Sequence, residues 1–271
     1  MNQPNKISTL VVLGVVCCGM AYSSQAQSTT IINETFTAPN GTTLSGLTPD
    51  QADYPGSKWT DTTYYNPSIQ NNILNIGADS GATISLASAG GYVKPASLTE
   101  SVTFKMNTDT YYGVGVGFSS VAVTVTNGNY HSNFTGFNIN NAGTLTLLAA
   151  GIGLGSVAWS GGSAFSPAQY YTLSYSLNTA NGSVSGIALS GSTANYSPLV
   201  TNALNNDAFS GPQTAYVEIW GQGGSGGNQA LFSNVSVSTT AAVSPVPEPG
   251  SLALGSIGLA GLIAARRRHG K

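Results

Sequence analysis

Ser101-Val102-Thr103-Phe104-Lys105-Met106 alternates strictly between polar and apolar residues. The next such stretch, Gly113-Val114-Gly115-Val116-Gly117-Phe118, repeats the alternation with glycine in the polar places. Because successive side chains of a strand point to opposite faces, a period of two indicates a strand with one buried face. Both stretches are therefore predicted to be β-strands, and Val102, Phe104 and Met106 are predicted to lie on the buried face.

The same alternation recurs along the chain on both sides of this pair. It is found around Val121/Val123/Val125, Phe137/Ile139, Leu145/Leu147, Leu173/Tyr175/Leu177, Val217/Ile219 and Val235/Val237. Turns rich in Asn and Gly separate the segments, and both residues tolerate the positive φ of hairpin turns. No segment between the two ends of the chain shows a sustained helical period. About a dozen short strands predict an all-β fold, an antiparallel sandwich of two sheets.

The N-terminus has the features of a secretory signal peptide. Lys6 supplies a positive charge, residues 7–20 are mostly apolar, and Ser24-Gln25-Ala26 fits a signal-peptidase site. Cleavage is expected after Ala26, which makes signal peptidase a predicted partner. A buried helix and lipidation at Cys17-Cys18 are the alternatives, and the residues before the cysteines do not fit a lipoprotein signal. No cysteine follows this pair, so the exported body is predicted to have no disulfide.

Three features follow one another at the C-terminus. They are Val246-Pro247-Glu248-Pro249-Gly250, an uncharged apolar run at 251–265, and Arg266-Arg267-Arg268. In hydrocarbon the backbone must hydrogen-bond within its own segment, so the apolar run is predicted to be helical. Flanking arginines stay on the cytoplasmic side. The helix would be about 22 Å long, shorter than the ~30 Å hydrocarbon core, which suits a transient anchor.

The order of these three features resembles the PEP-CTERM sorting signal of exported bacterial proteins. The resemblance implies processing near Pro247–Gly250 by an exosortase-type protease, and a membrane-stop role for Arg266–Arg268. It implies a cell-envelope, surface or extracellular-matrix protein, transiently anchored in the inner membrane. The expected organisation is a signal peptide (1–26), a β-sandwich (27–240), a linker with the Pro-Glu-Pro motif (241–250), a short transmembrane helix (251–265) and a basic cytoplasmic tail (266–271).

The body between the two signals carries few charges. It has three lysines, no arginine and nine acidic residues, which gives a net charge near −6. Nucleic-acid binding needs clustered cations that replace the counterions of phosphate, so this class of function is excluded. Ser, Thr, Asn and Gly must cover much of the surface, and such a surface suits contact with polysaccharide.

The two ends of the body resemble those of concanavalin A-like, laminin-G-like jelly rolls. Phe36-Thr37-Ala38-Pro39-Asn40-Gly41-Thr42-Thr43-Leu44-Ser45-Gly46-Leu47-Thr48-Pro49-Asp50, followed by Trp59 and Ile73-Leu74-Asn75-Ile76, is similar to their opening. Leu231-Phe232-Ser233-Asn234-Val235-Ser236-Val237 is similar to their closing strand. The resemblance implies a jelly-roll sandwich in which the closing strand pairs beside the first strand and Trp59 is buried.

No catalytic residue is predicted. Glycosidases of this fold use paired carboxylates on one strand, but Glu218 in Tyr216-Val217-Glu218-Ile219-Trp220 has no acidic residue two or four positions away. Glu218 is interpreted as a solvated charge on an outer face. His131 is the only histidine of the body, and without a Gly-x-Ser-x-Gly elbow it is interpreted as a surface-loop residue. A glycoside hydrolase or polysaccharide lyase of jelly-roll fold, and a purely structural or adhesive protein, remain the alternatives to a non-enzymatic binding protein.

Two weaker patterns concern ligands. Asp50 and Asp53 offer oxygens to Ca²⁺, which needs six or more ligands, but Asp50 is equally explained as a turn residue after Pro49, so no cofactor is expected. Aromatic rings stack on the apolar patches of sugars, which makes glycan contact a hypothesis for Tyr64, Tyr65, Tyr111 and Trp220. The alternative is that these rings pack inside the sandwich.

Overall fold

The computed structural model describes residues 28–52, 56–61, 66–77, 79–86, 95–106, 113–122, 133–140, 142–149, 152–158, 166, 169–179, 182–190, 215–222 and 230–240. All of them belong to one compact unit, Ala26–Ala242. The predicted signal peptide, linker motif, membrane helix and basic tail lie outside the described residues. Within the described part every regular element is a strand, and no helix there has the length and apolarity to cross a membrane.

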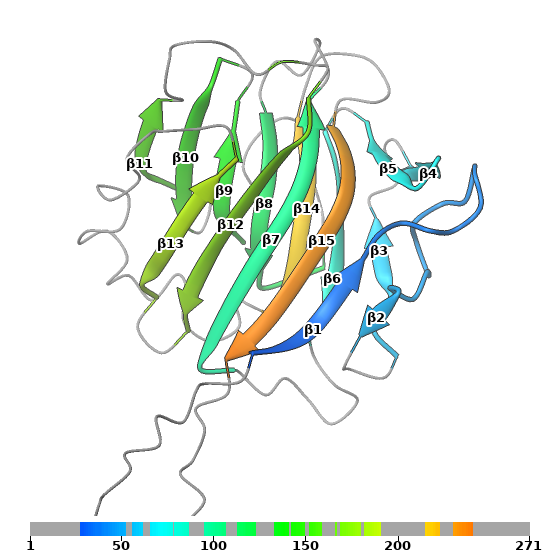
Figure 1. Cartoon of the computed structure of the whole chain (residues 1–271), viewed down its shortest axis with the longest axis horizontal. Coiled ribbons are helices and arrows are strands. Elements are labelled where there is room, and N and C mark those ends of the chain that lie inside the picture. Colours follow the sequence, from blue (N-terminus) through cyan, green and yellow to red (C-terminus); the bar gives the residue numbers. More distant parts are fainter. Residues whose placement is uncertain are drawn as a thin grey trace, which may run out of the picture. The chain divides into compact units, whose positions relative to one another are not determined.

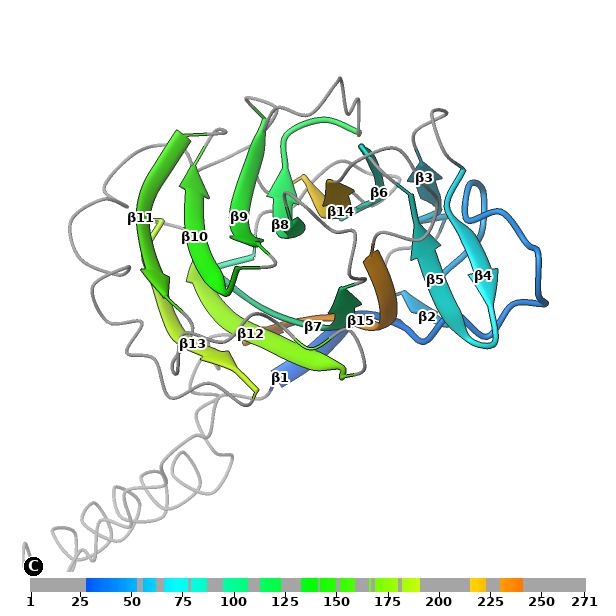
Figure 2. The same ribbon diagram turned by 90° about the horizontal axis from the view of Figure 1, so that it is seen from above.

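The all-β prediction is confirmed, because the strands form two antiparallel sheets stacked face to face (Figures 1 and 2). Sheet A has eight described strands. Its hydrogen-bonded order is β13 (Val184–Leu189), β12 (Tyr171–Asn178), β7 (Ser97–Met106), β15 (Ala230–Thr240), β1 (Ser28–Glu34) and β2 (Gln51–Ala52), and β5 (Ile73–Ile76) pairs with β15 and with β4 (Ser68–Gln70).

Sheet B has seven described strands and covers the inner face of sheet A. Its order is β11 (Ile152–Ala158), β10 (Thr144–Ala149), β9 (Phe134–Ile139), β8 (Gly113–Ser119), β14 (Tyr216–Gln222), β6 (Ser80–Ser85) and β3 (Trp59–Asp61). All its pairings are antiparallel, both between strands close in the chain, such as β9 and β10, and between distant ones, such as β8 and β14.

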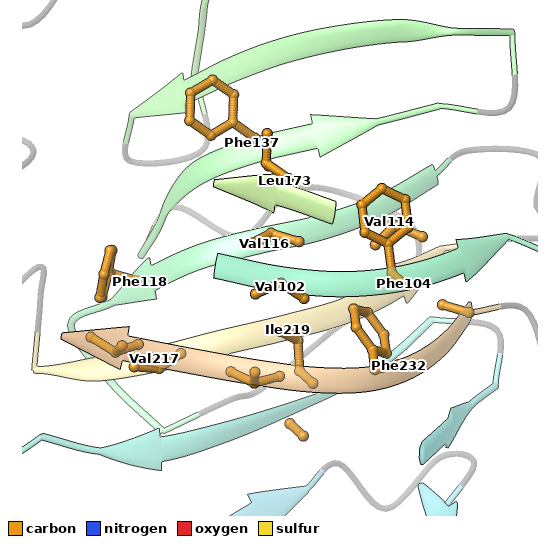
Figure 3. Close-up of a cluster of buried hydrophobic side chains, with 14 of the residues drawn as sticks. Val102, Phe104, Val114, Val116, Phe118, Phe137, Leu173, Val217, Ile219 and Phe232 are labelled. Carbon is orange, nitrogen blue, oxygen red and sulfur yellow. The ribbon is translucent and has the colours of Figure 1, made fainter. Parts of the chain in front are cut away.

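The core lies between the two sheets. On β7 the residues alternate between half-buried and buried along the whole strand, as the sequence predicts. Figure 3 shows Val102 and Phe104 of β7 and Phe232 of β15 beside Val116 of β8 and Ile219 of β14. All five side chains are fully buried. The predicted buried face of Ser101–Met106 is therefore confirmed.

The pairing of the first and last strands is also confirmed. β1 runs antiparallel to β15, with Ser28 opposite Thr240 and Glu34 opposite Val235. Trp59 is 1% exposed, as the jelly-roll resemblance implies, and its indole Nε1 donates to Glu34 Oε2 at 3.0 Å. Because Glu34 is in sheet A and Trp59 in sheet B, this bond joins the two sheets at one edge.

Only the beginning of the strand predicted around Val121/Val123/Val125 lies in the part of the chain that the structure describes. Val121 lies in a bend just after β8 and is 39% exposed, while Val123 and Val125 lie outside the described residues. Strand β8 ends at Ser119, whose hydroxyl donates to the Val121 carbonyl at 2.6 Å. A side chain that bonds its own backbone two residues ahead favours a turn over continued strand pairing.

Candidate functional site

The outer face of sheet A is an ordered array of polar side chains, here called the hydroxyl face. It consists of half-buried polar residues that alternate with the core residues on four neighbouring strands, and the half-buried apolar Leu231 of β15 lies at its end, opposite Lys105. The polar residues are Thr172, Ser174 and Ser176 of β12, Ser97, Thr99, Ser101 and Thr103 of β7, Asn234, Ser236 and Ser238 of β15, and Thr30 and Asn33 of β1. The strands β12, β7, β15 and β1 lie side by side across this sheet (Figure 1).

The hydroxyl face is arranged in three rows, because the strands pair in register. Residues that lie opposite one another form the rows Thr30–Ser238–Thr99–Ser176, Asn33–Ser236–Ser101–Ser174 and Asn234–Thr103–Thr172. Neighbouring strands are about 4.8 Å apart and every second residue along a strand repeats at about 6.7 Å. β12, β7 and β15 therefore present hydroxyl and amide groups on a regular grid, while a register shift on β1 separates Thr30 from Asn33 by three residues.

Hydrogen bonds across the strands fix several of these side chains. The hydroxyls of Thr99 and Ser176 lie 2.9 Å apart, and so do those of Thr103 and Thr172. Asn234 Nδ2 donates to Asn33 Oδ1 at 3.2 Å. Each hydroxyl has one donor and two acceptor sites, so one bond within a pair leaves further bonding capacity for a ligand.

Tyr170 and Lys105 lie beyond the third row. Lys105 follows Thr103 on the same face of β7, and its Nζ lies 5.7 Å from the centroid of the Tyr170 ring. Tyr170 is 36% exposed and Val121 is the other exposed large apolar side chain of the described residues. Partial burial raises the pKa of the Tyr170 hydroxyl, so it stays protonated at neutral pH. Lys105 is the one charged residue among the described side chains of this face.

Sequence reasoning did not single out Tyr170. The signal is its position before Tyr171–Asn178, where Tyr171, Leu173, Tyr175 and Leu177 take the buried face. The same period places Tyr170 with Thr172 and Ser174 on the outer face. The exposed member of the Tyr170-Tyr171 pair was therefore readable from the alternation.

The outer face of sheet B has the opposite character, and Trp220 lies on it. Trp220 is opposite Gly115 of β8 and Gly81 of β6 and is only 6% exposed. A Cβ added at Gly115 would fall 1.8 Å from the indole, so the ring fills the space that the glycine leaves. The Phe134 ring meets the indole edge-on, with centroids 5.5 Å apart. Trp220 thus packs within the fold, although outside the core between the sheets.

Glu218 shares this face, and its predicted solvation is wrong. The alternation placed it correctly on the outer side of β14, opposite Thr83 and Gly117, but the side chain is fully buried. The reason is that β8 and β9 are buried on both faces, unlike the strands of sheet A. In the described strands of this face Glu218 is the only carboxylate, whereas glycosidase chemistry of this kind needs two.

The carboxylate of Asp50, the calcium candidate, accepts hydrogen bonds from Thr35 and Thr37. One carboxylate oxygen accepts from the Thr35 amide at 2.9 Å and from the Thr35 hydroxyl, and the other accepts from the Thr37 hydroxyl at 2.8 Å. Partial burial acts to raise the pKa of Asp50, but these bonds outweigh it and lower the pKa. Asp50 therefore fastens the loop after β1.

The remaining sequence candidates Asp53, Tyr64, Tyr65, Tyr111 and His131 lie outside the described residues. No group of three or more His, Cys, Asp or Glu side chains is placed to hold a metal ion within the part of the chain that the structure describes.

Comparison with known protein families gives a match at the C-terminal end of the chain. No curated protein matches the sequence. Among solved structures, Lectin I from Ulex europaeus, in complex with the methyl glycoside of alpha-L-fucose, matches at a TM-score of 0.44 and 10% identity, over 79% of this chain and 98% of the lectin. The Ca²⁺/Man3GlcNAc-bound VIP36 exoplasmic/lumenal domain matches at 0.42 and 9%, over 70% and 89%.

Trypanosoma rangeli sialidase matches at a TM-score of 0.43 and 14% identity over 77% of this chain, which spans only 30% of the sialidase. A family model, the PEP-CTERM protein-sorting motif, matches residues 245–268. These residues contain the Pro-Glu-Pro motif, the apolar run and the arginine cluster that the sequence analysis singled out. The chain therefore carries a PEP-CTERM protein-sorting motif, which indicates an exported, envelope-sorted protein.

Proposed function

We propose that the exported body is a non-enzymatic surface or matrix module that binds an uncharged polysaccharide across the hydroxyl face. One observation supports this most: three rows of hydroxyl and amide side chains lie across β12, β7 and β15, and two of the rows continue onto β1. Sugars offer hydroxyls around their rims and apolar CH patches on their ring faces. The rows can hydrogen-bond the sugar hydroxyls, and the exposed Tyr170 ring can stack on the apolar CH patches.

The charge of the body favours an uncharged ligand. Lys105 is the single charge among the described residues of the hydroxyl face, and the whole body has a net charge near −6. A polyanion would be repelled by this field, while a neutral polymer would not. Binding through hydroxyls and one ring should be weak, about 4–8 kcal/mol per body, and becomes effective when many copies share a matrix.

The test is binding of the exported protein to neutral and uronate-bearing polysaccharides, with affinities from calorimetry. Tyr170→Ala is expected to weaken binding to the retained neutral polymer about tenfold, which is about 1.4 kcal/mol, because the stacking platform is lost. Val121→Ala removes an equally exposed apolar side chain elsewhere and should leave the affinity unchanged. Equal affinities of Tyr170→Ala and the wild type would place the site elsewhere.

The alternatives have their own signatures in the same experiment. Release of reducing sugar, abolished by Glu218→Gln, would favour the hydrolase. A protein that retains no polysaccharide would favour the purely structural or adhesive role. Under our proposal Glu218→Gln leaves binding unchanged, because Glu218 is buried on sheet B, away from the hydroxyl face.

Processing of the tail is a separate part of the proposal. We infer that an exosortase-type protease cleaves near Pro247–Gly250 after signal peptidase has removed residues 1–26. Mass spectrometry of the mature protein should then find no peptide from residues 252–265. Recovery of the intact tail from released protein would contradict processing.

A further inference from the structure

A carboxyl group lies in the core directly beneath the hydroxyl face. Glu100 is on β7 between Thr99 and Ser101, but it shares the buried face with Leu98 and Val102 and is fully buried. Across the sheet it is opposite Tyr175 of β12 and Val237 of β15. The strand that carries the middle of the hydroxyl face therefore also carries a carboxyl group into the core.

The surroundings of Glu100 provide little that would stabilise a negative charge. The Tyr175 hydroxyl donates to Glu100 Oε2 at 2.5 Å, and Oε1 has no hydrogen-bond partner among the described residues. From sheet B, Phe118 and Phe137 meet the Tyr175 ring edge-on, at centroid distances of 6.4 and 4.9 Å. Val237 is apolar, so Tyr175 is the titratable group that faces Glu100 from the neighbouring described strands.

A single neutral donor does not offset the cost of burying an ionised carboxylate. Burial raises the pKa of Glu100 well above its ordinary value, and the Tyr175 hydrogen bond counteracts only part of the shift. Burial also raises the pKa of Tyr175 well above its ordinary value, and the neighbouring carboxyl adds to the effect. In the folded protein both groups therefore hold their protons to a higher pH than a free glutamate and a free tyrosine do.

Glu34 provides the contrast on the same sheet. It also faces the core, from β1, but its two oxygens accept from the Phe36 amide at 2.6 Å and from the Trp59 indole at 3.0 Å. Burial raises the pKa of Glu34 too, while these two N–H donors lower it. Glu34 has the donors that an ionised form requires, and Glu100 does not.

We propose that Glu100 is a pH-sensitive latch under the hydroxyl face, closed while its carboxyl is neutral and opened by ionisation. An ionised Glu100 must reach water, and β7 must move for it to do so. Thr99, Ser101 and Thr103 move with the strand, so the rows of the hydroxyl face lose their register. The loss of structure follows from the burial of Glu100 alone, and only the accompanying release of polysaccharide rests on the proposed function.

The sign of the effect follows from proton linkage. The folded state holds the Glu100 proton more tightly than the unfolded state, so its contribution to stability is complete below the ordinary pKa of glutamate. That contribution declines as the pH rises above this value and is gone above the pKa of the folded state. In this window the folding equilibrium constant falls by up to about tenfold per pH unit for one linked proton.

The experiment is urea unfolding of the exported protein from about pH 4 to about pH 9, which spans the ordinary and raised ranges of a carboxyl pKa. The wild type should lose stability progressively up to neutral and alkaline pH. Glu100→Gln removes the titrating group and should flatten the profile there. Glu34→Gln, the matched control, should keep the decline at neutral pH. Equal slopes in Glu100→Gln and the wild type would overturn the latch.

A second variant covers the case in which Glu100→Gln does not fold. Tyr175→Phe removes the hydrogen bond that partly lowers the pKa of Glu100, so its stability should keep falling to a higher pH than in the wild type. Infrared spectra of the wild type should show the carbonyl band of a protonated carboxyl at neutral pH, and an absent band would refute the proposal. Polysaccharide release should follow the same pH profile; if no polysaccharide binds, only the proposed function fails.

Discussion

The outer faces of the two sheets are formed by strands with the same two-residue sequence period, but they differ in their exposure to solvent. Thr103, between Val102 and Phe104, is half-buried on sheet A, whereas Gly115, between Val114 and Val116, is buried on sheet B. The neighbouring strands explain the difference. Thr172 and Asn234 lie beside Thr103, and the Trp220 indole covers Gly115. Alternation tells which side chains share a face, and the strands that pair across it decide whether water reaches that face.

The largest expected loss of stability comes from adding a methyl group at Gly117 of β8, which lies opposite Gly136 of β9 in sheet B. A Cβ at Gly117 would lie 2.4 Å from the Thr135 carbonyl oxygen and 2.7 Å from the Gly136 Cα. Because the obstacles are backbone atoms, Gly117→Ala should cost about 3 kcal/mol or more of unfolding free energy. Ser101→Ala, at an outward position of sheet A, should stay within about 0.5 kcal/mol. Urea midpoints of the two variants measure the contrast, and similar losses would remove it.

A second test asks whether Trp220 is the reason that β8 carries glycine at position 115. Gly115→Ala should cost about 1–3 kcal/mol, because the new methyl group meets the rigid indole. In a Trp220→Ala background the obstacle is gone, and the same change should cost much less. The double-mutant cycle measures this coupling. Additive losses would mean that the indole does not determine the residue at 115.

The bond that joins the two sheets predicts a smaller, pH-dependent effect. Trp59→Phe removes the indole N–H from Glu34 and should cost about 1–2 kcal/mol. Since that bond lowers the pKa of Glu34, its loss raises the pKa further and extends the decline of stability to higher pH. The difference from the wild type should therefore be smallest at acid pH and grow on the alkaline side. A pH-independent difference would argue against ionisation of Glu34.

The smallest expected change in stability concerns the hydroxyl face. Thr103→Val together with Thr172→Val removes both hydroxyls of one pair with little change in shape, so stability should change by less than about 1 kcal/mol. Binding to neutral polysaccharide should weaken nonetheless, because one row loses its hydrogen-bonding groups. Thr48→Ala removes an exposed hydroxyl from the loop after β1 and is the control. Unchanged binding in the double variant would exclude this row from the site.

The sequence predicted the fold well, because the fold depends on local alternation and on turn residues. Alternation predicted the strand from Ser101 to Met106, while the resemblance to jelly rolls implied the buried Trp59 and the pairing of the closing strand with the first strand. Extending the first stretch backwards by one residue also places Glu100 on the buried face with Val102 and Phe104. The predicted strand began at Ser101, so Glu100 entered the prediction only through the net charge.

The candidate site was less predictable, because exposure depends on contacts between distant strands. Glu218 was placed on the correct face, but its burial follows from β8, β9 and Trp220, which the pattern of β14 alone does not reveal. Trp220 was a candidate for stacking on sugar because of its residue type, but its ring is buried against Phe134 and is only 6% exposed. Tyr170 was missed although its period is clear, because the candidate rings were chosen by residue type and not by the face that each ring takes.

The pairing of β15 between β1 and β7 would have a mechanical consequence under the proposed anchoring of the C-terminal tail. Such a pull would enter the described strands at Thr240, which lies opposite Ser28, and we consider the case in which it acts along β15. The bonds of β15 to β1 and to β7 lie across that direction and share the load, so they must fail together rather than one after another. A pull along β15 would therefore load both strand ladders in shear, the direction in which a pair of strand ladders resists most.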